Sequence, residues 1–141
     1  MIPSKDLMIG DWVYDGDKTQ FPMYVQAIGE DYVYLNFEGN EGDVWESTPE
    51  ELQGIPITEE LLTKMGARRV TDIGWNVIKT CLAGVRIECR VILFSGSEID
   101  VKISRDTPHF EDRCQSSSIH YLHELQNLYR YITKQELEVK L

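Results

Sequence analysis

The sequence has few of the residues from which metal centres, disulfide frameworks and phosphate-binding loops are built. Its 141 residues include three cysteines and three histidines. Cys81, Cys89 and Cys114 are odd in number and lack CxxC spacing, which argues against a disulfide framework or a zinc knuckle. The glycines are isolated turn residues, so the chain has no P-loop, no GxGxxG and no GxSxG. The enzyme classes that these motifs define are therefore excluded, and no cofactor is expected.

Long apolar runs are lacking as well. No stretch approaches the roughly 18 consecutive apolar residues of a membrane-spanning helix. The N-terminal residues MIPSKDLMIGDW do not follow the charged, apolar and small-residue order of a signal peptide. We therefore expect a cytoplasmic protein with free thiols and no contact with a membrane.

Positive charge is scarce, because 14 Lys and Arg stand against 24 Asp and Glu and give a net charge of -10. Such a charge repels phosphate backbones at long range, so nucleic-acid binding is disfavoured. The nearest approaches to a basic cluster are Arg68-Arg69 and the spread of Arg86, Arg90, Lys102 and Arg105. Acids interrupt both groups, and we interpret them as solubilising surface charge.

What is present is an ordinary globular composition, with 42% hydrophobic and 27% charged residues. Short aromatic-rich runs alternate with Gly, Asp and Asn turns in the first third, which indicates an antiparallel meander. A period of two places Val33 and Leu35 on one face of a strand, and Tyr32 and Tyr34 on the other. This part, residues 1–54, is predicted to be a small SH3-like antiparallel barrel.

Residues 55–70 are predicted to form a connecting helix and a linker. Thr58 can cap the first turn, Glu59 and Glu60 suit the positive end of a helix, and Gly66 suits its left-handed stop. These signals predict a helix of two turns over residues 59–65.

Residues 71–141 are predicted to form an antiparallel sheet packed by one helix. With Ala83-Gly84 and Ser95-Gly96-Ser97 as turns, three strands pair with apolar residues facing each other. The expected pairs are Leu82 with Val85, Ile78 with Cys89, Leu93 with Ile99, Val91 with Val101 and Cys89 with Ile103. A slip of one residue would turn Lys102 into the core, so this register is preferred, with Cys89 as a buried, inert thiol.

The remaining segments complete an α+β fold. Residues 104–118 are polar and are predicted to be a loop. Apolar residues then recur at steps of three and four over residues 119–132, as in an amphipathic helix. Leu137, Val139 and Leu141 alternate with polar residues, which predicts a last short strand.

The sequence alone leaves two kinds of candidate site, and the first is a site built from histidines. His120 and His123 lie close together on the predicted helix, and with His109 they would make the chain a small metal-binding protein or enzyme. An ordinary solvated helix face is the favoured interpretation. Cys114 with His109 is kept as a second, weaker catalytic pair.

The other candidate is an aromatic surface for a protein partner or for self-association. It comprises Tyr14, Tyr24, Tyr32, Tyr34 and Trp45. Tyrosine offers a large contact area together with a hydroxyl that can stay hydrated, so it is favoured at interfaces. The alternative is that this face packs inside the protein.

Segments at both ends of the chain carry a resemblance. LMIGDWV at residues 7–13, IPIT at 55–58 and IHYLHELQNLY at 119–129 are similar to a group of small uncharacterised proteins encoded by gut Bacteroidetes and their phages. The resemblance implies a phage-related or accessory context and transfers no catalytic residue. We therefore expect a non-enzymatic protein-interaction or accessory module, with the metal-binding protein or enzyme as the alternative.

Overall fold

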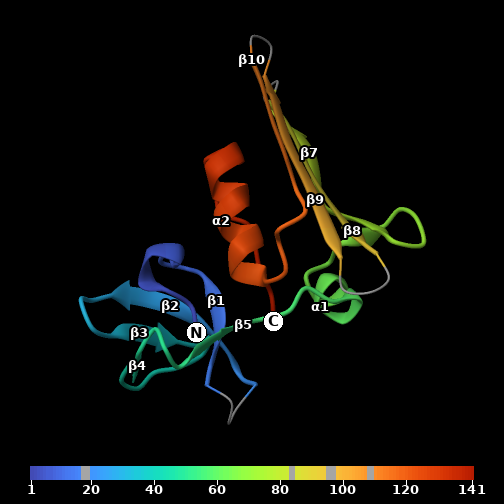
Figure 1. The fold of residues 1–141 in the computed structure, drawn as a ribbon. Helices are drawn as coiled ribbons and strands as arrows, with labels where there is room; N and C mark the ends of the chain where they lie inside the picture. The colour runs from blue at the N-terminus through green and yellow to red at the C-terminus, as the bar shows by residue number, and fades with distance from the viewer. Residues whose placement is uncertain (17–19, 83–84, 95–97, 108–109) are drawn as a thin grey trace. The chain divides into compact units, whose positions relative to one another are not determined.

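The structure is a computed structural model that describes residues 1–16, 20–82, 85–94, 98–107 and 110–141. The fold is α+β, with two five-stranded antiparallel sheets, and it divides into two compact units. The first unit is Met1–Pro56 with Tyr121–Asn127, and the second is Ile57–His120 with Leu128–Leu141. Figure 1 shows both units and labels most of their helices and strands. Among the described residues, no helix is long and apolar enough to cross a membrane.

The sheet of the first unit is a meander to which a fifth strand is added. Its strands are β1 (Trp12–Asp15), β2 (Pro22–Ile28), β3 (Val33–Asn36), β4 (Trp45–Ser47) and β5 (Leu52–Gly54), preceded by a 3-10 turn, η1 (Ser4–Asp6). The order is β4-β3-β2-β1-β5, with every pair antiparallel. The predicted antiparallel meander is confirmed. The residues described form no closed barrel.

The core of the first unit follows the alternation of its strands. Val13, Val25, Val33, Leu35 and Leu52 are fully buried on one face of the sheet. Each such side chain stabilises the fold by about 1.5–3 kcal/mol relative to an exposed one. The opposite face is therefore left for polar and aromatic side chains.

The second unit opens with a short helix, α1 (Glu59–Lys64), at the predicted position. Thr58 caps it, because its side chain accepts a hydrogen bond from the Leu61 N–H at 3.2 Å. Gly66 ends it with φ of 76°, and the Ala67 N–H donates to the Leu62 carbonyl at 3.0 Å. This is the Schellman geometry that favours glycine.

The sheet of the second unit has the order β10-β9-β8-β7-β6. Its strands are β6 (Arg68–Arg69), β7 (Gly74–Leu82), β8 (Val85–Leu93), β9 (Ile99–Thr107) and β10 (Phe110–Ser116), followed by the helix α2 (Leu122–Thr133). Every predicted cross-strand pair is confirmed, including Ile78 with Cys89 and Val91 with Val101. The turn residues 83–84 and 95–97 lie outside the described residues.

Two segments differ from the sequence prediction. The polar stretch predicted as a loop instead extends β9 and forms β10, which pairs with β9 through register partners such as Cys114 and Ile103. Backbone hydrogen bonds form this strand, and its side chains have no apolar alternation by which it could be recognised. The predicted last strand is also wrong, since residues 135–141 are in no strand and Leu137 is buried without strand pairing.

The amphipathic helix is confirmed as α2, although it begins at Leu122 and ends at Thr133. Leu122, Leu125 and Tyr129 on its apolar face are buried. Lys134 follows in the left-handed conformation, with φ of 60°, and ends the helix. Residues up to Asn127 belong to the first unit and the rest of the helix belongs to the second.

Candidate functional site

The outer face of strands β8, β9 and β10 carries a grid of polar side chains. The register places these side chains in three rows of cross-strand neighbours. The first row is Arg90, Lys102 and Gln115, the second is Glu88, Ser104 and Arg113, and the third is Arg86 and Asp106. Neighbouring strands lie about 4.8 Å apart and alternate residues of one strand about 6.6 Å apart, so the grid brings these side chains within reach of one another.

Strand alternation decides which side chains reach this face. Ile87, Cys89 and Val91 are buried on the inner face, so the residues between them point outward. β10 has no apolar alternation of its own, but Cys114 pairs with Ile103. That pairing places Arg113 on the outer face beside Ser104.

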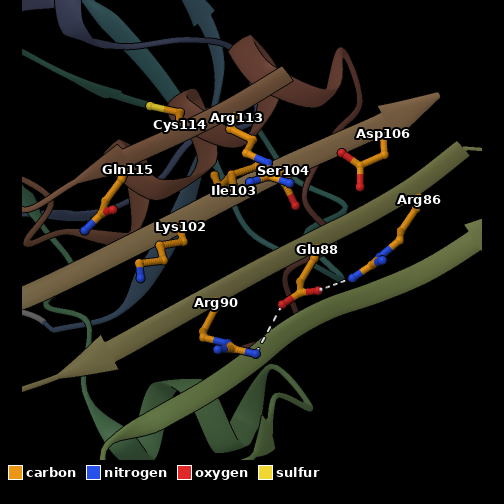
Figure 2. A pocket seen from close by; sticks show the side chains of 10 residues that line it. All are labelled: Arg86, Glu88, Arg90, Lys102, Ile103, Ser104, Asp106, Arg113, Cys114 and Gln115. Atoms are coloured by element: carbon orange, nitrogen blue, oxygen red, sulfur yellow. Dashed lines mark hydrogen bonds and ion pairs between the residues drawn. The ribbon is translucent and has the colours of Figure 1, made fainter. Parts of the chain in front are cut away.

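These side chains line a hollow of about 440 Å³ on the surface of the sheet. Its lining includes four cationic side chains, Arg86, Arg90, Lys102 and Arg113, and two acidic ones, Glu88 and Asp106. Figure 2 shows them rising from the three strands around the hollow. The hollow therefore has an excess of positive charge in a chain whose net charge is -10.

Glu88 holds two of the arginines in place. Its carboxylate contacts Arg86 at 3.3 Å and Arg90 at 3.2 Å, as the dashed lines in Figure 2 mark. The side chains of Arg86 and Arg90 are 56% and 43% exposed, so these ion pairs contribute little to stability. Because a guanidinium has five N–H donors, the two groups are oriented by Glu88 and keep donors for an anion.

Part of this cluster was predicted from the sequence to be solubilising surface charge. The structure brings Arg86, Arg90 and Lys102 to one face. Arg105 is not with them, because it pairs with Ile87 and lies on the inner face. Arg113 was missed because its strand was predicted as a loop, and only the pairing of β10 with β9 could have revealed it.

The candidate metal-binding histidines are placed differently from one another. His120 is exposed and precedes α2, whereas His123 lies on α2 with only 5% of its surface exposed. His109 lies outside the described residues. Within the part of the chain that is described, no group of three His, Cys, Asp or Glu residues could hold a metal ion.

His123 is a buried imidazole beside carboxylates. Its Nδ1 atom is buried without a hydrogen-bond partner in the described structure, and its ring stacks on Tyr121 with 6.0 Å between centroids. Loss of hydration lowers the pKa of His123, opposed by the negative charges of Asp11, Glu124 and Asp6. Burial therefore favours the neutral form of the ring.

The two cysteines whose side chains are described, Cys89 and Cys114, differ in burial, and the predicted pair of Cys114 with His109 stays a prediction. Cys89 is fully buried, which confirms its predicted burial, and burial raises the pKa of its thiol to about 12. Cys114 is a half-buried free thiol on β10. The side chain of Cys81, like His109, lies outside the described residues.

The structure brings together three of the five aromatic residues proposed for a partner surface. Tyr14, Tyr24 and Tyr34 are half-buried on the face of the first sheet opposite its apolar core. Tyr32 is 46% exposed just before β3. Trp45 is 56% exposed but pairs in register with Leu35 of the core face, and its indole N–H donates to Asp15. Partner binding by these residues stays a prediction.

The two terminal motifs that carry the resemblance meet inside the first unit. Gln126 accepts a hydrogen bond from the Trp12 N–H at 2.8 Å and donates one to the Gly10 carbonyl at 3.0 Å. Asn127 donates to the buried Asp11 carboxylate at 3.0 Å. These motif residues hold the part of α2 that belongs to the first unit against β1, so they have a structural role.

No protein family, curated protein or solved structure matches the chain. Its function must therefore be argued from the geometry and charge of the hollow on the second sheet.

Proposed function

We propose that this protein is a non-enzymatic interaction module that binds an acidic segment of a partner protein on the outer face of β8, β9 and β10. One observation carries the proposal. Four cationic side chains converge on one hollow, although acids outnumber bases by ten in the whole chain. Charge complementarity of this kind steers a partner to one surface and fixes its register there.

A protein segment suits this face better than a nucleic acid does. Glu88 and Asp106 interrupt the cations, and a continuous phosphate backbone would be repelled both by these acids and by the net charge of the chain. An extended acidic peptide has spaced carboxylates for Arg90 and Lys102 and backbone N–H donors for the two acids. Its residue spacing of about 3.3 Å also matches that of the strands.

Other features support an accessory role inside a cell. The free thiols of Cys89 and Cys114 fit a reducing compartment such as the cytoplasm. The strand order β4-β3-β2-β1-β5, in which β5 pairs with β1, is compatible with an SH3-like arrangement of the first unit. The resemblance of both chain ends to proteins of gut Bacteroidetes and their phages supports a phage or prophage context.

Fluorescence anisotropy with a labelled peptide of alternating Glu and Ser tests the proposal. We expect saturable binding that weakens as salt rises from about 0.05 to 0.3 M. Arg90→Gln combined with Lys102→Gln should weaken binding about tenfold, since it removes two cations from the hollow.

Lys5→Gln combined with Lys64→Gln is the matched control, because it removes the same charge from exposed positions elsewhere. This control should change the affinity by less than about twofold. Equal effects of the two double variants, or tighter binding of single-stranded DNA than of the peptide, would overturn the proposal.

A further inference from the structure

A second depression, of about 270 Å³, lies on the same sheet. It is lined by Val70, Thr71, Ile73, Gly74, Ile92 and Phe94, with Arg90 as its one charged member. Val70, Ile73 and Phe94 are 48%, 43% and 44% exposed. Grouped apolar side chains with this much exposure are typical of a binding surface, whereas single ones need no explanation.

Backbone hydrogen bonds fix both walls of this apolar groove. In the turn between β6 and β7, the Val70 N–H donates to the Gly74 carbonyl at 2.9 Å. At the end of β8, the Phe94 N–H donates to the Glu98 carbonyl at 2.8 Å, and the Leu93 N–H donates to the Ile73 carbonyl at 2.7 Å. The groove is therefore preformed, which lowers the entropy cost of filling it.

Gly74 leaves room in this turn because it has no side chain. A Cβ there would lie 2.7 Å from the Thr71 Oγ1, which itself accepts a hydrogen bond from the Gly74 N–H at 2.8 Å. Gly74 also pairs in register with Ile92. The apolar groove thus belongs to the same outer face as the cationic hollow.

Arg90 lines both the apolar groove and the cationic hollow. Ile92 lies two residues further along β8, so the outer face changes from cationic to apolar over about 6.6 Å. A ligand that spans Arg90 would meet both surfaces at once.

We infer that the partner segment of the proposed function carries an apolar anchor residue close to its acidic residues. The apolar groove binds the anchor side chain of the partner segment. Arg90 and Lys102 bind a carboxylate of the same extended segment about two residues from the anchor. This inference rests on the proposed function. Charge complementarity at Arg90 argues for an acidic segment over an uncharged apolar one.

Two peptides of equal charge test the inference, one with Phe two residues before its first Glu and one with Ser there. We expect the Phe peptide to bind the full-length protein about tenfold more tightly, as burial of one aromatic side chain allows. Ile73→Ser combined with Phe94→Ser should abolish this advantage and leave the affinity for the Ser peptide unchanged. Both residues are exposed, so the variant should fold.

Ile28→Ser combined with Val44→Ser is the matched control, because it removes exposed apolar residues from the first unit and should preserve the advantage. Equal affinity of the two peptides for the unmodified protein would overturn the inference while leaving the proposed function standing. A concentration-dependent dimer that Ile73→Ser dissociates in sedimentation would also overturn it, because a second copy would then cover the groove. Failure of both peptides to bind would overturn the proposed function itself.

Discussion

Gln126 Oε1 accepts a hydrogen bond from the Trp12 N–H at 2.8 Å. The Nε2 atom of the same side chain donates to the Gly10 carbonyl at 3.0 Å. One side-chain amide therefore supplies both the acceptor and the donor that a neighbouring strand would offer to β1. This pairing occurs where β1 extends beyond its partner β5, which ends at Gly54 opposite Val13.

Replacement of Gln126 by Leu should destabilise the first unit. Gln126 is 2% exposed, so the Trp12 N–H and the Gly10 carbonyl would lose their partner away from water. We expect a loss of about 2–4 kcal/mol in the free energy of unfolding, measured by urea denaturation. Gln135→Leu, at an exposed position, is the control and should change stability by less than about 0.5 kcal/mol. A loss of that small size for Gln126→Leu would mean that the hydrogen bonds of Gln126 to Trp12 and Gly10 are not needed for stability.

Stability should fall on acidification because of His123. The fold lowers the pKa of His123 below its ordinary value of 6.5, chiefly through loss of hydration. The unfolded chain therefore binds a proton as the pH falls through about 6.5 while the folded chain does not, so the free energy of unfolding decreases. The decrease ends below the folded pKa, and its slope is at most about 1.4 kcal/mol per pH unit.

Urea melts between about pH 8 and 5 would measure this dependence. His123→Gln should flatten the profile, whereas His120→Gln, at an exposed position, should leave it as in the unmodified protein. If the free energy of unfolding of His123→Gln depended on pH as steeply as that of the unmodified protein, another group would be responsible for the pH dependence.

Cys89 should resist thiol reagents in the folded protein. It is fully buried and its pKa is raised to about 12, so the reactive thiolate is rare at neutral pH. We expect labelling with iodoacetamide, followed by mass spectrometry of peptides, to modify Cys114 well before Cys89. In denaturant the two should react at similar rates. Rapid labelling of Cys89 under native conditions would contradict its place in the core.

Much of the fold could be predicted because apolar alternation constrains the register. Val91 and Val101 pair as expected, since a slip of one residue would place Lys102 in the core. The short helix at Thr58 was equally predictable, because its cap and its glycine stop are local signals. Such features need no knowledge of distant contacts.

The site could be predicted only in part, because it depends on a strand with no apolar pattern. β10 is held by backbone pairing with β9, which places Arg113 beside Ser104 and completes the cationic hollow. Arg105 was grouped with Arg86 and Arg90 by sequence proximity, yet alternation places it on the inner face. The contact of Gln126 with Trp12 joins residues 114 positions apart, which no local pattern indicates.

Amide chemical shifts of the full-length protein during titration with the Glu-Ser peptide test the central claim most directly. We expect the shifts to concentrate on the residues whose side chains line the cationic hollow, which are Arg86, Glu88, Arg90, Lys102, Ser104, Asp106, Arg113 and Gln115. In the Arg90→Gln and Lys102→Gln double variant, about ten times more peptide should be needed to reach the same shifts. Shifts concentrated instead on the tyrosine face of the first unit, at Tyr14, Tyr24 and Tyr34, or unaltered by the double variant, would contradict the account.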